Sequence, residues 1–209
     1  MADKTEYVNY SGFGNHIEVI HSLGLSIEVS LNKAYNELGN LKTATGWKGP
    51  QYDKLVKCFN DMRDGFDTIL EDIGYKIPNM MNSAAKAWAA VDGASFAEKL
   101  IETMKPIVTL VPSGEPALTW NKDAVDTARK SIEGHLDSAT NDIKELATKF
   151  KAMNTDWQGQ DFDDNLKDIN SYSNDVAAKV DELKSDFVKY MNESIAAYDE
   201  VRKSVSEWK

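Results

Sequence analysis

The feature that most constrains the fold is a Trp-x-Gly tripeptide that occurs twice, as Trp47-Lys48-Gly49 and Trp157-Gln158-Gly159. The two copies are 110 residues apart, and each opens a long segment in which apolar residues return at that same offset. Such a repeated ladder indicates a duplicated helical unit. The aligned pairs include Val56/Leu166, Phe59/Ile169, Phe66/Val176, Leu70/Val180, Ile73/Leu183, Ile77/Phe187, Met80/Tyr190, Ala87/Ala197 and Val91/Val201.

Apolar residues spaced at three and four predict four long helices. They are expected at about 16–43, 50–91, 125–153 and 160–209. Asn15 followed by Glu18 resembles a capping box, which places the start of the first helix there. Pro78 lies inside the second helix, where the apolar phase continues past it, so a kink rather than an end is expected.

The segment between the second and third helices divides the chain into 1–92, a linker at 93–120, and 121–209. Phe96 to Met104 has the composition of a short helix. Beyond it, the apolar runs 107–111 and 117–120 flank Pro112-Ser113-Gly114-Glu115, and this order predicts a short β-hairpin.

An apolar stripe on each helix has to be covered by another element. The sequence therefore predicts an all-α fold in which two long helix-turn-helix hairpins form an antiparallel four-helix bundle. Because each hairpin has a like partner in the same chain, the halves are expected to pair intramolecularly, giving mainly a monomer. The predicted core contains Phe59, Phe66, Ile73, Leu136, Ile143, Leu146, Phe150, Val176 and Leu183.

Charge and hydropathy exclude several classes of partner. The net charge is −10, and an acidic chain repels phosphate backbones and anionic membrane surfaces, so no nucleic acid and no stable membrane insertion are expected. No stretch approaches the roughly 18 apolar residues that a membrane span requires. The N-terminal residues lack the pattern of a cleaved signal peptide. The single cysteine, Cys58, is predicted to be a half-buried, inert thiol.

Residues that could carry chemistry do not form a recognisable site. His16 and His21 are five apart and so do not share a helix face, and His135 is distant in sequence. The run Asp161, Asp163 and Asp164 lacks the glycine and the distant glutamate of a calcium loop, and fits the acidic first turn of a helix. No metal, no cofactor and no catalytic residues are expected, which indicates a protein that is not an enzyme.

The duplicated hairpins with Trp-x-Gly in the turn resemble the WXG (Esx) family of small proteins exported by type VII secretion systems. The chain looks like two members fused in tandem, over about 15–92 and 121–205, with Trp47, Gly49, Trp157 and Gly159 as the matching turn motif. The resemblance implies antiparallel pairing of hairpins and secretion from the cytoplasm without a cleaved signal peptide. It also implies that the partners are the secretion machinery or another WXG-type protein.

Many members of that family carry an export motif late in the second helix, an aromatic residue followed four residues later by an acid. Trp88 and Asp92 fit this motif in the first half. In the second half Tyr198 is in place, but Arg202 stands where the acid is expected, so this copy departs from the motif. Two other functions stay open: a helical-bundle pore-forming or membrane-active toxin, and a scaffold bundle that is not exported.

Antiparallel hairpins make a prediction about the two turns. The first hairpin ends and the second begins at opposite ends of such a bundle, so the segment 92–120 has to travel along it. This arrangement places Trp157 near Trp88 and Asp92, as one composite export surface, and places Trp47 near Tyr198. Substitutions at Trp157, Trp88 or Asp92 are expected to impair export and leave folding intact.

Overall fold

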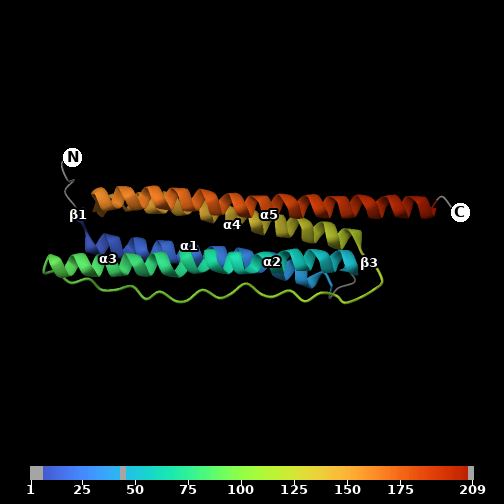
Figure 1. Ribbon diagram of the computed structural model, residues 1–209, viewed down its shortest axis with the longest axis horizontal. Helices are drawn as coiled ribbons and strands as arrows, with labels where there is room; N and C mark the ends of the chain where they lie inside the picture. Colours follow the sequence, from blue (N-terminus) through green and yellow to red (C-terminus); the bar gives the residue numbers. More distant parts are fainter. Residues whose placement is uncertain (1–6, 43–45, 207–209) are drawn as a thin grey trace.

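The computed structural model describes residues 7–42 and 46–206 and is mostly helical (Figure 1). The helices are α1 (Tyr10–Asn40), α2 (Pro50–Glu71), a π-helical turn η1 (Asp72–Lys76), α3 (Ile77–Val91), α4 (Lys122–Ala152), a 3-10 turn η2 (Met153–Thr155) and α5 (Gln160–Ser206). Four two-residue strands complete it: β1 (Tyr7–Val8), β2 (Trp47–Lys48), β3 (Thr119–Trp120) and β4 (Trp157–Gln158). The predicted ends of the first helix at 43 and of the last at 209 lie outside the described residues.

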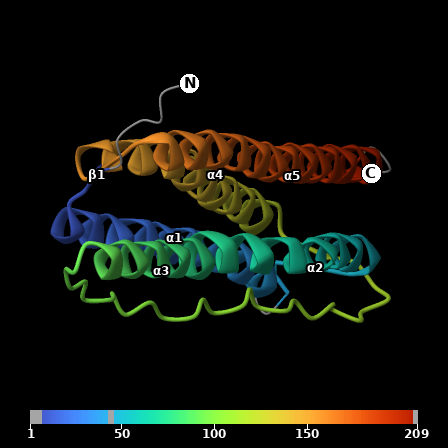
Figure 2. The same ribbon diagram turned by 60° about the vertical axis from the view of Figure 1, so that its left-hand side comes forward.

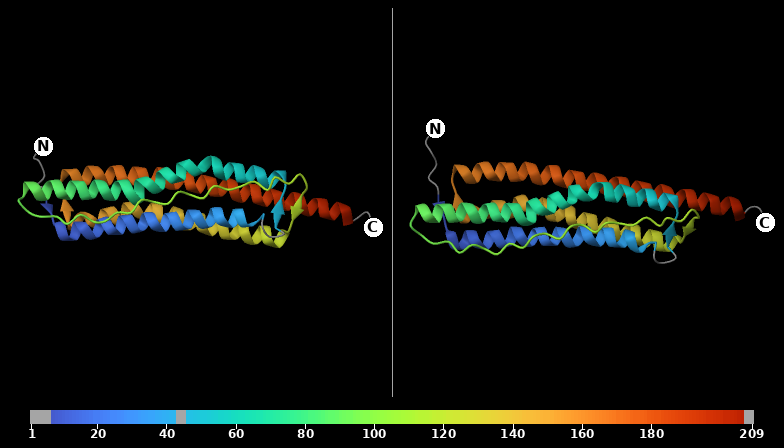
Figure 3. Two further views of the ribbon diagram at one scale, coloured as in Figure 1. Left: turned by 90° about the horizontal axis from the view of Figure 1, so that it is seen from below. Right: turned by 60° about the horizontal axis from the view of Figure 1, so that its bottom comes forward.

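The long helices lie side by side in an elongated molecule (Figures 1 and 2). α1 and the continuous rod α2–η1–α3 make the first hairpin, and α4 and α5 make the second. The most extensive helix contacts are those of α4, which packs on α1 and on α5. The turns of the two hairpins lie at opposite ends of the molecule, and α5 extends past the other helices (Figure 3).

One continuous hydrophobic core joins the two hairpins. All nine predicted core residues are buried, with Phe59, Ile73, Leu136, Ile143 and Leu146 fully so. The apolar ladder continues beyond this core into the C-terminal parts of both hairpins, where Met80 is 67% exposed, Val91 86% and Val201 62%. The heptad pattern therefore identifies the buried middle of each hairpin, and it overestimates how far the burial extends.

The first helix begins six residues before its predicted start. Its N-cap is Asn9, whose side chain accepts a hydrogen bond from the Gly12 backbone N–H, whereas Asn15 lies exposed inside the helix. Val8 before the cap and Phe13 occupy the two positions of a hydrophobic staple. Glycines at 12 and 14 weaken the helical signal in this stretch, which is why the later Asn15–Glu18 pair resembled a start.

Pro78 is accommodated by a π-helical turn and by a histidine. In an α-helix the carbonyl of Gly74 accepts from residue 78, but proline has no N–H to donate. The π turn η1 precedes Pro78, and Nδ1 of His21 lies 2.7 Å from this carbonyl oxygen, to which it donates. At the same crossing, a Cβ on Gly24 of α1 would lie 2.2 Å from Cα of Gly74, so the two backbones touch. At the position of the predicted kink, the structure has a π-helical turn whose free carbonyl is bonded by His21 of α1.

The predicted short helix at 96–104 and the predicted β-hairpin within the linker are both wrong. Residues 94–118 have no helix and no strand, and Thr119–Trp120 pairs with Trp47–Lys48 instead of with 107–111. This segment, which we call the strap, follows the first hairpin from one end to the other on the side away from α4 and α5 (Figures 2 and 3). The expectation that the linker travels along the helices is confirmed.

Candidate functional site: two aromatic ends

Each Trp-x-Gly turn is built in the same way. The glycines Gly49 and Gly159 have φ of 114° and 134°, a conformation that a residue with a Cβ rarely adopts. The preceding tryptophan lies in a short strand that pairs antiparallel with the segment before the first helix of the other hairpin. Trp47 is opposite Trp120, and Trp157 is opposite Val8. Each turn is therefore completed by the other half of the chain.

The turn of the second hairpin forms an aromatic cluster with the end of α3, here called the Trp157 cluster. Trp157 is 4% exposed and meets four rings edge-on. The centroid distances from Trp157 are 5.1 Å to Trp88, 5.5 Å to Phe13, 5.5 Å to Phe162 and 6.0 Å to Phe150. Edge-to-face pairs of this kind each contribute about 0.5–1.5 kcal/mol beyond burial. The predicted neighbours Trp88 and Trp157 are thus in direct contact.

Asp92, the acid of the predicted export motif, lies at the surface of this end. Asp92 caps the end of α3, and its carboxylate accepts a hydrogen bond from the hydroxyl of Tyr10. This bond, with a smaller contribution from the partial burial and from the negative charge of Asp92, raises the pKa of Tyr10 to about 12. Tyr10 opens α1, so the start of the first helix holds the acid in place beside Trp88.

A second carboxylate, Asp156, ties the same turn to α1. Its oxygens are 3.0 Å from Nε2 of His16 and 2.7 Å from Nδ2 of Asn9, and its carbonyl accepts from the Asn9 N–H at 2.7 Å. Burial of Asp156 opposes ionisation, but the bonds from His16, Thr155 and Asn9 outweigh it and lower the pKa of this carboxyl below 3.8. The lowered pKa means that these bonds stabilise the fold above pH 3.8, and that this contribution is lost as the pH falls through the lowered value.

The opposite end of the molecule gathers a different set of aromatic residues around Trp47. Trp47 packs edge-on against Trp120 at 5.1 Å and lies 6.5 Å from Tyr190, while Trp120 lies 4.9 Å from Tyr198. Tyr198 therefore reaches the first turn through Trp120, a contact that the sequence did not predict. Gly46 takes the position that Asp156 holds at the other end, and its carbonyl accepts from the Asn121 N–H at 2.6 Å.

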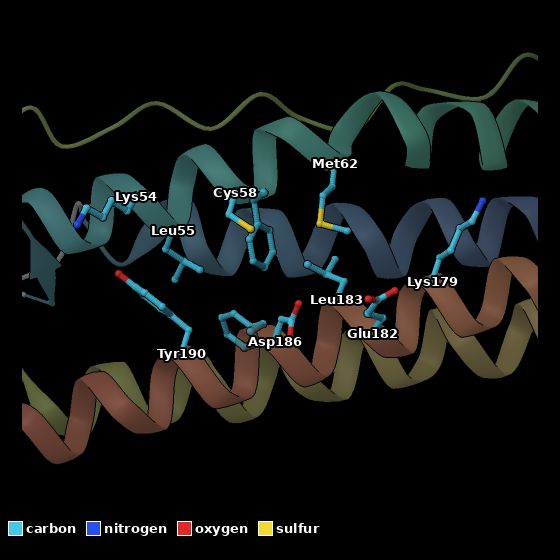
Figure 4. A pocket seen from close by; sticks show the side chains of 11 residues that line it. Lys54, Leu55, Cys58, Met62, Lys179, Glu182, Leu183, Asp186 and Tyr190 are labelled. Carbon is cyan, nitrogen blue, oxygen red and sulfur yellow. The ribbon is translucent and has the colours of Figure 1, made fainter.

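Three apolar grooves lie along the seam between the second helices of the two hairpins. One of about 360 Å³ borders the Trp157 cluster and includes Met80, Met81 and Ile169. One of about 400 Å³ lies beside Trp47, Trp120 and Tyr198 at the opposite end. The third, of about 480 Å³, lies midway between α2 and α5 and is shown in Figure 4. These grooves lie where α2 and α3 of the first hairpin face α5 of the second.

Cys58 lies in the middle groove and is exposed, so the prediction of a half-buried thiol is wrong. Partial desolvation in the groove, and then the carboxylates of Asp61 and Asp186, raise the pKa of Cys58. A raised pKa leaves less thiolate at neutral pH, which makes the thiol a weaker nucleophile.

The other polar candidates have structural roles. His16 bonds to Asp156 and His21 bonds to Gly74, while Asp161 and Asp163 lie in the acidic first turn of α5. In residues 7–42 and 46–206, no group of three or more His, Cys, Asp and Glu side chains is placed to hold a metal ion. Over the same residues, no helix is both long and apolar enough to cross a membrane.

The burial of Trp157 corrects one prediction about the site. A side chain that is 4% exposed in the middle of an aromatic cluster contributes to stability, so its substitution is expected to destabilise the fold as well as alter the surface. Asp92, by contrast, is exposed and Trp88 is half-buried, so these residues remain available to a partner. Tyr10, Phe13 and Asn9 also belong to this end, and no local pattern marks them in the sequence because their partners are more than 70 residues away.

Comparisons with protein-family models, with curated proteins and with solved structures found no match to this chain.

Proposed function

We infer that this chain is a non-enzymatic, helical interaction protein exported by a type VII secretion system, built like two WXG (Esx) proteins fused in tandem. It acts as a substrate or adaptor of that system, and its partners are the secretion machinery or another WXG-type protein. The fold that goes with this inference is an antiparallel four-helix bundle in which the two halves serve as each other's partner.

The observation that carries this inference is the contact between Trp88 and Trp157, whose ring centroids are 5.1 Å apart. It brings the Trp-x-Gly turn of one half against the aromatic residue of the export motif in the other half. Asp92 lies one helical turn beyond Trp88, on the surface, so a partner that binds this end meets both halves of the chain together.

Pairing within one chain predicts that the protein is mainly a monomer in solution. Each turn is completed by a strand from the other hairpin of the same chain, and the core is continuous between the hairpins, so no second copy is needed to cover it. Light scattering at micromolar concentration measures the mass directly. An obligate dimer at that concentration would contradict the proposal and would indicate exchange of hairpins between chains.

Replacing Asp92 by asparagine is expected to reduce export in a bacterium that carries a type VII secretion system. A hydrogen bond to a charged group contributes roughly 1.5–3 kcal/mol, so its loss at the recognition surface lowers the exported fraction by about tenfold or more. The measurement is the ratio of protein in the culture supernatant to protein in the cells. The cellular level and the melting temperature of each variant are measured alongside, so that an unstable variant is recognised.

Two matched controls separate recognition from structure. Tyr10→Phe removes the same intramolecular hydrogen bond but keeps the carboxylate of Asp92, so export should stay at the wild-type level. Arg202→Ala alters the corresponding position of the second half, which lacks the acid, and should also have no effect. If Tyr10→Phe reduces export as strongly as Asp92→Asn, the carboxylate only holds the helix end. If Asp92→Asn is exported normally, this acid is not a signal.

A further inference from the structure

The strap buries one side chain in three along most of its length. Ile101, Met104, Ile107, Leu110 and Ser113 face the first hairpin, and the two residues between each neighbouring pair are exposed. A period of three is that of the polyproline II helix, which has three residues per turn and makes no internal hydrogen bonds. The backbone N–H and C=O groups of such a segment need partners from outside it.

α2 provides these partners at intervals of seven residues. Three side-chain oxygens on this helix each accept from a strap amide, and the amides are three residues apart. The bonds from N to Oδ1 are Ser113 to Asp53 at 2.6 Å, Leu110 to Asn60 at 2.9 Å and Ile107 to Asp67 at 2.6 Å. The series continues at Gly74, where the missing side chain makes room for Met104: a Cβ there would lie 2.3 Å from its sulfur. Three strap residues are thus matched to one heptad of the helix.

The other wall of the groove is α1, and it binds strap amides that lie one residue along from the inward-facing side chains. Glu28 of α1 accepts from the Lys105 N–H at 2.8 Å, and Asn32 accepts from the Val108 N–H at 3.1 Å. Two asparagines, Asn60 and Asn82, bind the strap through both amide atoms, accepting from the N–H and donating to the C=O of Leu110 and Lys99. The remaining register contains Pro106 and Pro112, which have no N–H.

The lengths of the two elements agree. From Lys99 to Ser113 a polyproline II helix rises about 43 Å at 3.1 Å per residue. From Asp53 to Asn82 an α-helix rises about 43 Å at 1.5 Å per residue. The first and last side-chain partners therefore lie opposite the first and last strap amides that they bind, so the match extends along the whole groove.

The second hairpin lacks this groove, although it is a copy of the first. At the 110-residue offset, Asp53 and Asn60 correspond to Asp163 and Asn170, but Asp67 corresponds to the buried Ala177. Gly74 corresponds to Lys184, which bonds to Asp137 and Asp181 and bridges α4 and α5. The equivalent face of the second hairpin is closed by these ion pairs, so the groove that holds the strap belongs to the first hairpin.

Glycines in a left-handed conformation lie just before the strap and just after its last groove-facing residue, Ser113. Gly93 and Gly114 each have φ of 66°, and neither has any atom within 4 Å of the position a Cβ would take. Neither glycine packs against a neighbouring side chain, and the Gly114 N–H donates to Asp53 at 3.2 Å, so the segment between the two glycines is held by the groove. We propose that the groove between α1 and α2–α3 is a receptor for extended peptides with an apolar side chain at every third residue, and that residues 99–113 are its resident ligand.

The test keeps the full chain and introduces protease sites at Gly93 and Gly114, so that cleavage turns the strap into a separate peptide. After cleavage the excised strap should stay with the protein through gel filtration. A fluorescent synthetic peptide of residues 94–115 should then replace it, with saturable binding measured by anisotropy. Loss of the excised strap together with absence of peptide binding would overturn the proposal.

Control variants compare groove-facing with exposed positions in the peptide, and equivalent positions of the two hairpins in the protein. In the peptide, Leu110→Glu should abolish binding, whereas Val111→Glu, one residue away and 62% exposed, should bind like the parent. In the protein, Asn60→Ala removes two hydrogen bonds and should weaken binding by about tenfold, while Asn170→Ala at the equivalent position should not change it. Equal binding of both peptide variants would show that the groove does not select by register.

Hydrogen exchange on the uncut chain provides a test that does not require the cleaved form to fold. The amides of Ile107, Leu110 and Ser113, and those of Lys105 and Val108, should exchange slowly, while that of Thr109 should exchange fast. This protection with a three-residue period supports the proposal. Uniformly fast exchange over 99–113 would show that the groove does not hold the strap and would overturn it.

Discussion

Replacing Trp157 by alanine is expected to lower the free energy of unfolding by about 3–5 kcal/mol, because it removes a large buried ring and leaves a cavity. The ring is 4% exposed and contacts Trp88, Phe13, Phe150 and Phe162, which come from α3, α1, α4 and α5. The substitution therefore loosens one end of every long helix at once. Urea denaturation followed by circular dichroism measures the change.

The neighbouring Gln158 is the control for this substitution. It lies in the same strand but is exposed, and its side chain donates to the Asn154 carbonyl at 2.8 Å. Gln158→Ala should change the stability by no more than about 0.5 kcal/mol, as expected for an exposed position. If Trp157→Ala costs less than the control, the Trp157 cluster is not what holds this end together.

Replacing Leu146 by alanine is expected to lower the free energy of unfolding by roughly 2–5 kcal/mol. Leu146 lies on α4, the helix that packs on both α1 and α5, and its side chain is fully buried. The lost burial of the removed methyl groups and the cavity that they leave both contribute, since helices held from two sides cannot close the gap. Guanidinium denaturation with an unchanged slope would assign the loss to the native state.

Leu100→Ala removes the same atoms from a side chain that is 86% exposed, and it should change the stability by about 0.5 kcal/mol or less. The difference between the two leucine variants then measures burial alone. A loss well under 1 kcal/mol for Leu146→Ala would mean that the stripe of α4 does not form the core.

The long helices and the core were predictable because they depend on local periodicity. The spacing that placed Phe59, Leu146 and Leu183 in the core is the period of a helix with one covered face, and it needs no information about the rest of the chain. The start of α1 was not predictable in this way. Asn9 owes its role to a turn that lies 147 residues away, where its side chain bonds to Asp156.

The strap shows a different limit of prediction from sequence. Its period of three is present in the sequence, as are Asp53, Asn60 and Asp67 at intervals of seven, but each pattern is ambiguous alone. Phe96, Leu100 and Met104 are spaced four apart, which is also helical spacing, so 96–104 resembled a helix. The two patterns predict the structure only when the strap lies against α2, because the side chains of α2 provide the hydrogen bonds that favour the extended form.

The exchange of strands between the hairpins has a consequence for synthesis. Tyr7 and Val8 pair with Gln158 and Trp157, so the first strand to leave the ribosome waits for about 150 further residues before its partner exists. At translation rates of about 5–20 residues per second, the delay is on the order of 8–30 seconds. During that interval the apolar stripe of the first hairpin has no cover from the second. A chaperone or another helical hairpin that meets the nascent chain therefore has a window of seconds in which to bind it, and this window closes once the second turn is made.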